Sequence, residues 1–308
     1  SVENGMAAPL AVLLTILVGV AVGLFNGFWV AYVGIPGFIT TLAGMLLFRG
    51  LSTILVGESV PIKSQAYRNI AKGYLPNVLG FAGPFDVLTL VIGILIIAFI
   101  IYSTLRNIKR AISAGITLSS NDKTLKYITA GVGIIVVGFV TYLLAQSGNG
   151  TEGGMPITLV IVGLLFVMYN FITTSTVFGR QVYAVGGNRK AATLSGINTR
   201  LVDFKLFLHM GFLVSIASIV MLSRSASATA VAGQEFEMDA IAACFIGGTA
   251  VTGGAGTIPG VMIGSAVMGV LNQGLSLLGV SSAWVKAIKG LVLLLAVAFD
   301  IMSKKKKR

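Results

Sequence analysis

Long apolar runs, separated by short polar loops, constrain this chain more than any other feature. A helix that crosses a bilayer needs about 20 mostly apolar residues, with a usable range of about 17–25. Eight segments meet this requirement: residues 9–30, 36–56, 87–103, 127–145, 157–176, 204–222, 258–278 and 284–302. Residues 241–252 are too short to cross alone and predict half of a broken helix. The predicted fold class is all-α, a polytopic membrane helix bundle of about 8–9 spans with at least one broken or short helix.

The scarcity of charge supports the same class. The chain has 308 residues, of which 56% are hydrophobic and only 10% are charged. A soluble domain carries roughly 25% charged residues, so this chain could not cover a soluble surface, and the lipid bilayer must be most of its solvent. No long polar stretch could make a second domain. We therefore predict one transmembrane domain over residues 1–308.

The positions of the basic residues predict the orientation. Residues 104–126, 177–205 and the tail 303–308 each hold five of the 22 Lys and Arg residues. The positive-inside rule places these three regions, and with them the C-terminus, in the cytoplasm, and places residues 57–86, 146–156 and 223–240 outside. The net charge of +12 is thus explained by an anionic leaflet, without nucleic acid as a partner. Residue 1 then lies outside with no signal peptide, which suggests further spans upstream.

One predicted cytoplasmic loop contains a short capped segment. Asn188 is a good N-cap residue, and Gly196 suits the left-handed position that ends a helix. A helix of two turns fits between them, and its small face (Ala191, Ala192, Ser195) could sit in a shallow cleft of another protein. An ordinary capped helix with no partner is the alternative. The spacing alone leaves both interpretations open.

Three separated motifs carry a resemblance to a known family. The first is the segment just described: Gly186, Asn188, Ala191, Ala192, Ser195, Gly196 and Ile197, spaced as Gly-x-Asn-x-x-Ala-Ala-x-x-Ser-Gly-Ile. The others are an early block at residues 26–50 and a late glycine-rich block at residues 237–256. Together they resemble the ABC-type monosaccharide importer permeases of the ribose/xylose/galactose family, and within it the xylose or multiple-sugar permeases. Members of that family usually have N-terminal spans that this chain lacks.

The resemblance implies a function and a set of partners. The first segment would be the coupling helix of a permease subunit that translocates a pentose or hexose into the cytoplasm. The implied partners are cytoplasmic ABC ATPase subunits, an extracytoplasmic sugar-binding protein and a second copy of the permease, in a bacterial inner membrane. ATP hydrolysis would belong to the ATPase, because this chain has no Gly-x-x-x-x-Gly-Lys-Ser/Thr loop. A branched-chain amino-acid ABC permease and an ion-coupled secondary transporter are the alternatives.

Polar residues within apolar segments are the candidates for a translocation path. They are Asn26, Arg49, Asn170, Asn272 and Gln273. An ionisable residue within a span suggests a functional site, although an arginine near the headgroups can also snorkel. Neutral amides suit a sugar path, but interhelical hydrogen bonds explain them equally. The glycines at positions 256, 260 and 264 likewise allow close packing, a hinge or a dimer seam.

No group of residues predicts catalysis or a cofactor. His209 and Cys244 are the only histidine and the only cysteine, which excludes an internal disulfide and argues against a transition-metal site. No nucleophile stands beside the histidine or a paired carboxylate. We predict a transport subunit with no metal and no cofactor, and not an enzyme.

Overall fold

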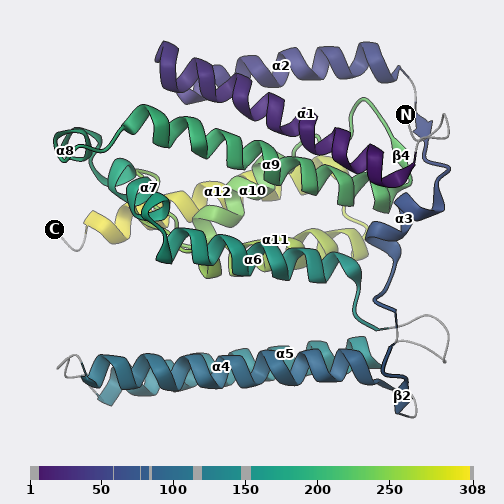
Figure 1. Cartoon of the computed structure of the whole chain (residues 1–308), viewed down its shortest axis with the longest axis vertical. Coiled ribbons are helices and arrows are strands. Elements are labelled where there is room, and N and C mark those ends of the chain that lie inside the picture. Colours follow the sequence, from purple (N-terminus) through teal and green to yellow (C-terminus); the bar gives the residue numbers. More distant parts are fainter. Residues whose placement is uncertain are drawn as a thin grey trace. The chain divides into compact units, whose positions relative to one another are not determined.

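The part of the chain that the structure describes is mainly helical. The computed structural model describes residues 7–57, 59–76, 78–82, 85–113, 120–146 and 154–305, and within them it has twelve α-helices and four two-residue strands (Figure 1). By length and composition, seven helical segments could cross a membrane: Ala8–Val33, Gly37–Val56, Val87–Arg106, Tyr127–Ala145, Ile157–Ser175, Thr199–Ser225 and Ile258–Leu277. This confirms the all-α, polytopic class with a count of seven. The eighth predicted segment lies in α12 (Ser282–Lys305), which is not one of the seven.

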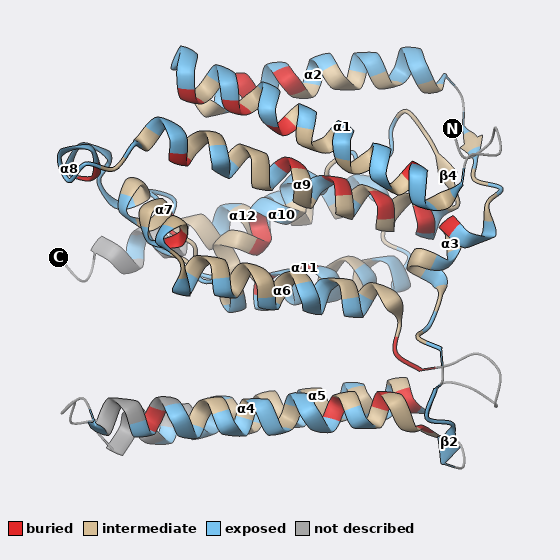
Figure 2. Ribbon diagram, in the orientation of Figure 1, coloured by how far each residue is buried: buried red, intermediate tan, exposed pale blue. Residues whose placement is uncertain are grey.

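Most of the surface of these helices is apolar and exposed. In no spanning segment is more than 22% of the apolar window buried, and Figure 2 shows exposed residues along the length of the helices. Ile54 and Leu55 on α2 (Gly37–Val56), for example, are 80% and 82% exposed. Water does not tolerate apolar surface of this extent on a soluble protein. These faces are therefore built for the bilayer or for other membrane chains.

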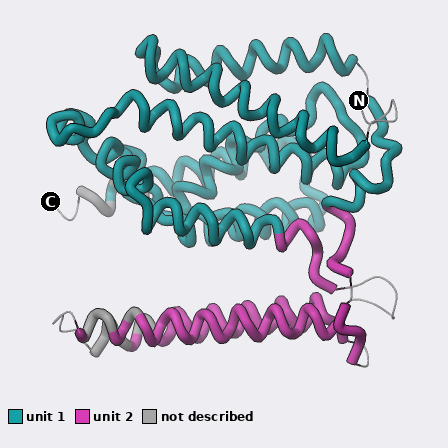
Figure 3. The backbone as a smooth tube through the Cα atoms, viewed as in Figure 1, with its two compact units in different colours: residues 1–70, 161–308 teal, residues 71–160 magenta. Residues whose placement is uncertain are grey.

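The chain divides into two compact units, residues 1–70 with 161–308 and residues 71–160 (Figure 3). The second unit is a hairpin of α4 (Val87–Ser113) and α5 (Ser120–Ala145), preceded by the paired strands β2 (Phe81–Ala82) and β3 (Phe85–Asp86). Asp86 caps α4 by accepting hydrogen bonds from the amides of Leu88 (3.3 Å) and Thr89 (3.1 Å). The cap explains why the apolar run becomes helical at Val87.

In the first unit, α1 (Ala8–Phe28) and α9 (Thr199–Ser225) pack antiparallel through glycine. A Cβ atom at Gly19 would lie 2.7 Å from the carbonyl oxygen of Gly211, and one at Gly23 would lie 2.6 Å from that of Phe207. Such distances leave no room for a side chain, so the two backbones touch. A π-helical turn, η1 (Trp29–Val33), extends α1 and ends at Gly34, after which α2 begins.

A pair of short strands and a short helix pack together at the C-terminal end of α9. Strand β1 (Val60–Pro61) pairs with β4 (Ser227–Ala228), and α3 (Gln65–Lys72) places Tyr67 in a core with Ala11 and Ile219. The fully buried hydroxyl of Ser223 lies 2.8 Å from the carbonyl oxygen of Tyr67. Burial raises the pKa of the Tyr67 phenol. This assembly ties the segment after α2 to the end of α9.

The last three helices contain the predicted broken helix, with different bounds. The short helix is α10 (Phe236–Ile246), not residues 241–252, and its 11 residues give a length of about 16 Å, roughly half of a bilayer core. A glycine-rich loop, residues 247–257, then leads into α11 (Ile258–Leu277), which returns antiparallel to α10. Gly264 packs against the backbone of α10 at Ala243, and Gly260 packs against Gly247, the residue directly after α10. Close packing within the chain is therefore the observed role of these two glycines. Gly256 precedes α11 and is not part of that contact.

Candidate functional site

The predicted coupling segment is two helices that share one joint residue. Thr176 begins α7 (Val177–Gly187), its hydroxyl oxygen accepting a hydrogen bond from the amide of Gly179 at 3.1 Å. Asn188 ends α7, because its amide donates to the carbonyl of Ala184 at 3.0 Å. Its side-chain oxygen accepts from the amide of Ala191 at 3.0 Å and begins α8 (Arg189–Leu194). The predicted N-cap is confirmed, and no free residue separates the two helices.

The end of α8 also follows the prediction. Gly196 has φ +81°, the left-handed conformation that glycine adopts without a Cβ clash. The amide of Ile197 donates to the carbonyl of Ala192 at 3.0 Å, the 6→1 bond of a Schellman motif. The helix α8 therefore begins and ends at the asparagine and the glycine from which its bounds were predicted.

The predicted docking face of α8 needs a correction. Ala191 and Ser195 are exposed, but Ala192 is only 4% exposed and packs within the chain itself. The residue that projects is Leu194, which is 89% exposed. Sequence reasoning missed it because an apolar residue in a capped two-turn helix is expected to be buried against the rest of the protein. Single exposed leucines are common, but this one lies in the segment that the sequence predicts to contact another protein.

Charge also fixes α8 to the span that follows it. Arg189 donates a hydrogen bond to the Asp203 carboxylate of α9 and forms an ion pair with it. Asn198 caps α9, its side-chain oxygen accepting from the amide of Leu201 at 3.1 Å. The Arg189 side chain is 55% exposed, so this pair contributes at most about 1 kcal/mol. Its effect is to orient α8 on the first turn of α9.

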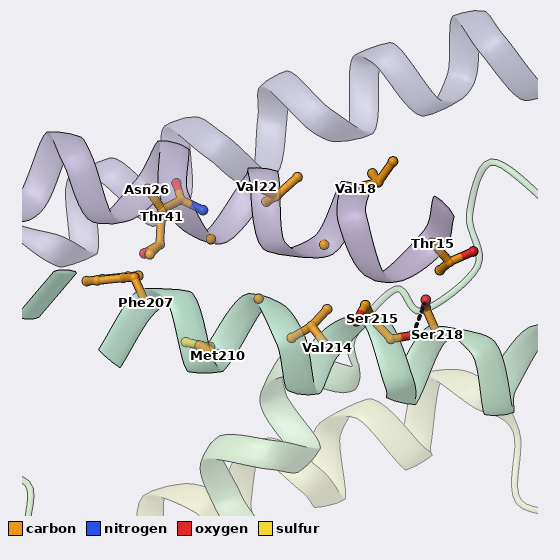
Figure 4. Close-up of a pocket in the computed structure, with 13 residues that line it drawn as sticks. Thr15, Val18, Val22, Asn26, Thr41, Phe207, Met210, Val214, Ser215 and Ser218 are labelled. Carbon is orange, nitrogen blue, oxygen red and sulfur yellow. Dashed lines mark hydrogen bonds between the residues drawn. The ribbon is translucent and has the colours of Figure 1, made fainter. Parts of the chain in front are cut away.

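The residues predicted for a translocation path do not gather at one place. Asn26 lines a cavity of about 250 Å³ between α1 and α9, with Thr15, Thr41, Ser215 and Ser218 (Figure 4). The four hydroxyls are bonded to carbonyls of their own helices. Asn26 Oδ1 is buried and has no hydrogen-bond partner.

The other four predicted path residues lie on three further helices. Arg49 is half-buried on α2, and Asn170 is half-buried on α6 (Ile157–Ser175). Gln273 is exposed on α11, next to Asn272. The structure thus brings Asn26 to a cavity and Asn272 to a polar cluster, and it leaves the remaining three on separate surfaces.

That polar cluster joins α10, α11 and α12, and sequence reasoning missed it. Lys289 Nζ lies 2.9 Å from each carboxylate oxygen of Asp239, and Asn272 Nδ2 donates to Asp239 Oδ2 at 3.0 Å. The Lys289 contact with Oδ1 lacks hydrogen-bond geometry, and Asn272 Oδ1 accepts no hydrogen bond. A second pair, Lys286 with Glu235 at 2.6 Å, lies one turn away. The signal in the sequence is a pair of lysines in an apolar segment and three acids spaced by two, within residues 223–240, which the basic-residue pattern predicts to be an external loop.

The isolated histidine and cysteine are packed residues. His209 Nδ1 lies 3.1 Å from the hydroxyl of Tyr169, and its ring stacks on Phe178. Cys244 is partly buried on α10. Within the described residues, no group of three or more His, Cys, Asp and Glu side chains could hold a metal ion.

Comparison with known proteins shows the family. Residues 1–297 match the family described as branched-chain amino acid transport system / permease component. The xylose transport system permease proteins of Haemophilus influenzae and Escherichia coli are 38% and 37% identical to the chain over 98% of its length, covering 76% and 73% of their own. The ribose import permease protein of Bacillus subtilis is 42% identical over 52% of the chain and 49% of its own length. No solved structure matches the chain.

These relatives and this family are transport subunits and not enzymes, and the apolar helices place the chain in the inner membrane as a multi-pass protein. The matched residues include the coupling segment, the early block and the late glycine-rich block on which the resemblance was based. The chain therefore belongs to the ABC importer permease family of the ribose/xylose type.

Proposed function

We propose that this chain carries a monosaccharide, a pentose or hexose, across the inner membrane as one of two identical permease subunits. Cytoplasmic ABC ATPases drive the complex, and an extracytoplasmic sugar-binding protein supplies it. The observation that carries the proposal is the similarity to xylose permeases over 98% of the chain. A branched-chain amino acid is the second candidate substrate, because it stands in the description of the matched family.

The orientation and span count belong to the proposal. In Figure 1, α8 and the C-terminal end of α12 lie at the same end of the first unit, and β1 and β4 lie at the other end. The basic loops and tail argue that the end with α8 is cytoplasmic. Counting α12 as an eighth crossing, and the stretch from β4 through α10 as a ninth, gives the 8–9 spans, which form one permease domain.

The proposed contact with the ATPase is α8, with Leu194 as its apolar anchor. Ala191, Ser195 and Gly196 are exposed around it, and an apolar side chain inserted into a pocket is the usual centre of such a contact. Leu194→Asp should abolish co-purification of the ATPase, because burying the carboxylate in the cleft is costly. Lys190→Ala, on the exposed face of the same helix, is the matched control and should retain the ATPase. If Leu194→Asp binds the ATPase normally, α8 docks by another face.

The proposed path passes the polar groups of the membrane segments: Asn26, Arg49, Asn170, Asn272 and Gln273. Asn26 and Asn272 each keep a buried amide oxygen without a hydrogen-bond donor. Sugar hydroxyls are donors of the kind that these oxygens lack. The two residues are therefore the first positions at which to seek a change in sugar preference.

The deciding experiment is reconstitution in liposomes. The chain alone should neither hydrolyse ATP nor accumulate xylose or ribose. With its ATPase and binding protein it should accumulate the sugar against a gradient when ATP is inside. Accumulation of leucine instead would select the second candidate. Sugar uptake by the chain alone, driven by a proton or sodium gradient, would contradict the ABC mechanism.

A further inference from the structure

The C-terminal end of α7 touches the glycine-rich loop between α10 and α11, backbone against backbone. A Cβ atom at Gly186 would lie 2.6 Å from the amide nitrogen of Gly254, and one at Gly253 would lie 2.8 Å from the carbonyl oxygen of Gly186. Gly253 and Gly254 have φ of +85° and +74°, a conformation in which other residues are strained. Neither side of this contact has room for any side chain.

A hydrogen bond fixes the same two segments one turn earlier. The hydroxyl of Tyr183 on α7 donates to the carbonyl oxygen of Gly256 at 2.8 Å. The loop is also folded on itself, since the amide of Ala250 donates to the carbonyl of Ala255 at 2.9 Å. The loop that α7 contacts is therefore stabilised by its own hydrogen bond. Close-packed contacts of this kind transmit displacement because they have low compressibility.

Both partners of the contact are joined directly to functional elements. On one side, Gly186 lies two residues before Asn188, which ends α7 and begins α8 with no flexible residue between. On the other side, the loop ends in α10 and α11, which carry Asp239 and Asn272. Gly264 packs against the backbone of α10, and Gly260 packs against Gly247 directly after it, so α11 lies in close contact with this end of α10. A displacement of α8 thus has a short and stiff route to the polar cluster of Asp239, Asn272 and Lys289.

We propose that the contact of Gly186 with Gly253 and Gly254, held by Tyr183, transmits movement of α8 to the α10–α11 pair. Gly186 and Tyr183 are then positioning residues for transport: they touch neither sugar nor ATP. This inference rests on the proposed function, because α8 must be the element that the ATPase moves. The inference adds to the proposed function the helices that would move, α10 and α11, and the contact through which they would be moved.

The chain offers a matched pair of variants. Gly186→Ala places a methyl group against Gly254, whereas a Cβ atom at the neighbouring Gly187 meets nothing within 4 Å. Both glycines are the last residues of α7, so Gly187→Ala controls for the change in helix propensity. Tyr183→Phe removes only the hydrogen bond to Gly256 and keeps the ring, which provides a variant that folds even if Gly186→Ala does not.

The reporter is Cys244, the chain's own single cysteine, on α10. In the complex with its ATPase, we expect the rate of maleimide labelling at Cys244 to change roughly threefold or more between the nucleotide-free and the ATP-plus-vanadate states. Gly187→Ala should keep this change. Gly186→Ala and Tyr183→Phe should each lose at least half of it. Tyr183→Phe, which lies outside the coupling motif, should do so while retaining ATPase co-purification and basal ATP hydrolysis.

Two results would overturn the inference. One is a nucleotide-dependent change at Cys244 in Tyr183→Phe and Gly186→Ala that equals the change in Gly187→Ala. The other is the absence of any such change in the unaltered complex. Failure of the proposed function is a separate result, because it appears as a lack of ATP-driven sugar uptake by the unaltered complex, whatever Cys244 reports.

Discussion

Neighbouring residues of α8 differ sharply in what they do. Ala192 is buried against the rest of the chain, and Leu194, two positions on, is almost fully exposed. Asn188 serves two helices at once: its amide donates to the carbonyl of Ala184 as the C-cap of α7, and its side chain is the N-cap of α8. The surface offered to a partner is therefore decided by how α8 is rotated on α9, and the Arg189–Asp203 pair helps to set that rotation.

The end of α8 should depend on backbone conformation alone. No atom lies within 4 Å of a Cβ atom placed at Gly196, and its φ is +81°. Gly196→Val should therefore destabilise the helix end by about 1–2 kcal/mol through the left-handed conformation and not through a clash. Gly196→Asn, which tolerates that conformation, should behave like the unaltered chain. The measurement is ATPase co-purification together with sugar uptake, and equal results for the two variants would contradict the argument.

Neutralising Asp239 should destabilise the protein. Asp239→Asn leaves Lys289 charged among three packed helices, a loss of about 1–3 kcal/mol once the partial exposure of the two side chains (18% and 22%) is taken into account. Thermal unfolding in detergent should show a lower midpoint for this variant. The control variant Glu237→Gln, whose carboxylate is exposed, should leave the midpoint almost unchanged. The double variant Asp239→Asn, Lys289→Gln should recover part of the loss. Without recovery, the two residues do not act as a pair.

At the scale of elements, glycine decides which helices pack. The contacts of α1 with α9, of α10 with α11 and of α7 with the 247–257 loop all bring backbones together where no Cβ atom fits. Lipid is as apolar as the helix surfaces, so close approach and van der Waals contact, not burial from water, drive this association. Short, precise contacts of this kind also explain how so few buried residues hold the first unit together.

The α1–α9 contact should be intolerant of added volume. Gly23→Val places atoms against the carbonyl of Phe207 and the backbone of Gly211, which costs about 1–3 kcal/mol of overpacking. Gly138→Val on α5, where nothing lies within 4 Å, is the matched control. Gly23→Val should lower the thermal midpoint and Gly138→Val should not. Equal midpoints would show that α1 can move away from α9 at no cost.

At the scale of the whole molecule, the distribution of charge should set the orientation in the membrane. After replacement of Cys244, a cysteine at position 190 should resist an impermeant maleimide added to intact cells, and one at position 150 should react. Position 190 lies in the basic region 177–205, whereas position 150 lies in a loop without Lys or Arg, outside the described residues. Reaction at 190 alone would invert the proposed topology.

The sequence by itself determined the class, the positions of seven spans and both caps of α8. It could do so because these features are local: an apolar run of 20 residues, an asparagine at an N-cap and a glycine with positive φ each act on their immediate neighbours. The resemblance to sugar permeases also rested on local motifs, and the relatives confirmed it.

Only the tertiary structure decided the contacts between distant segments. The sequence predicts Asp239 in a loop, whereas the structure places it on α10 beside Lys289, 50 residues later. The glycines of the 247–257 loop contact α7, a partner that the sequence does not indicate. Equally, nothing in the sequence distinguished the buried Ala192 from the exposed Leu194. α8 has only six residues, too few to show a periodic apolar face, and the spanning helices are apolar on both faces, so in each case packing against other helices chooses the buried face.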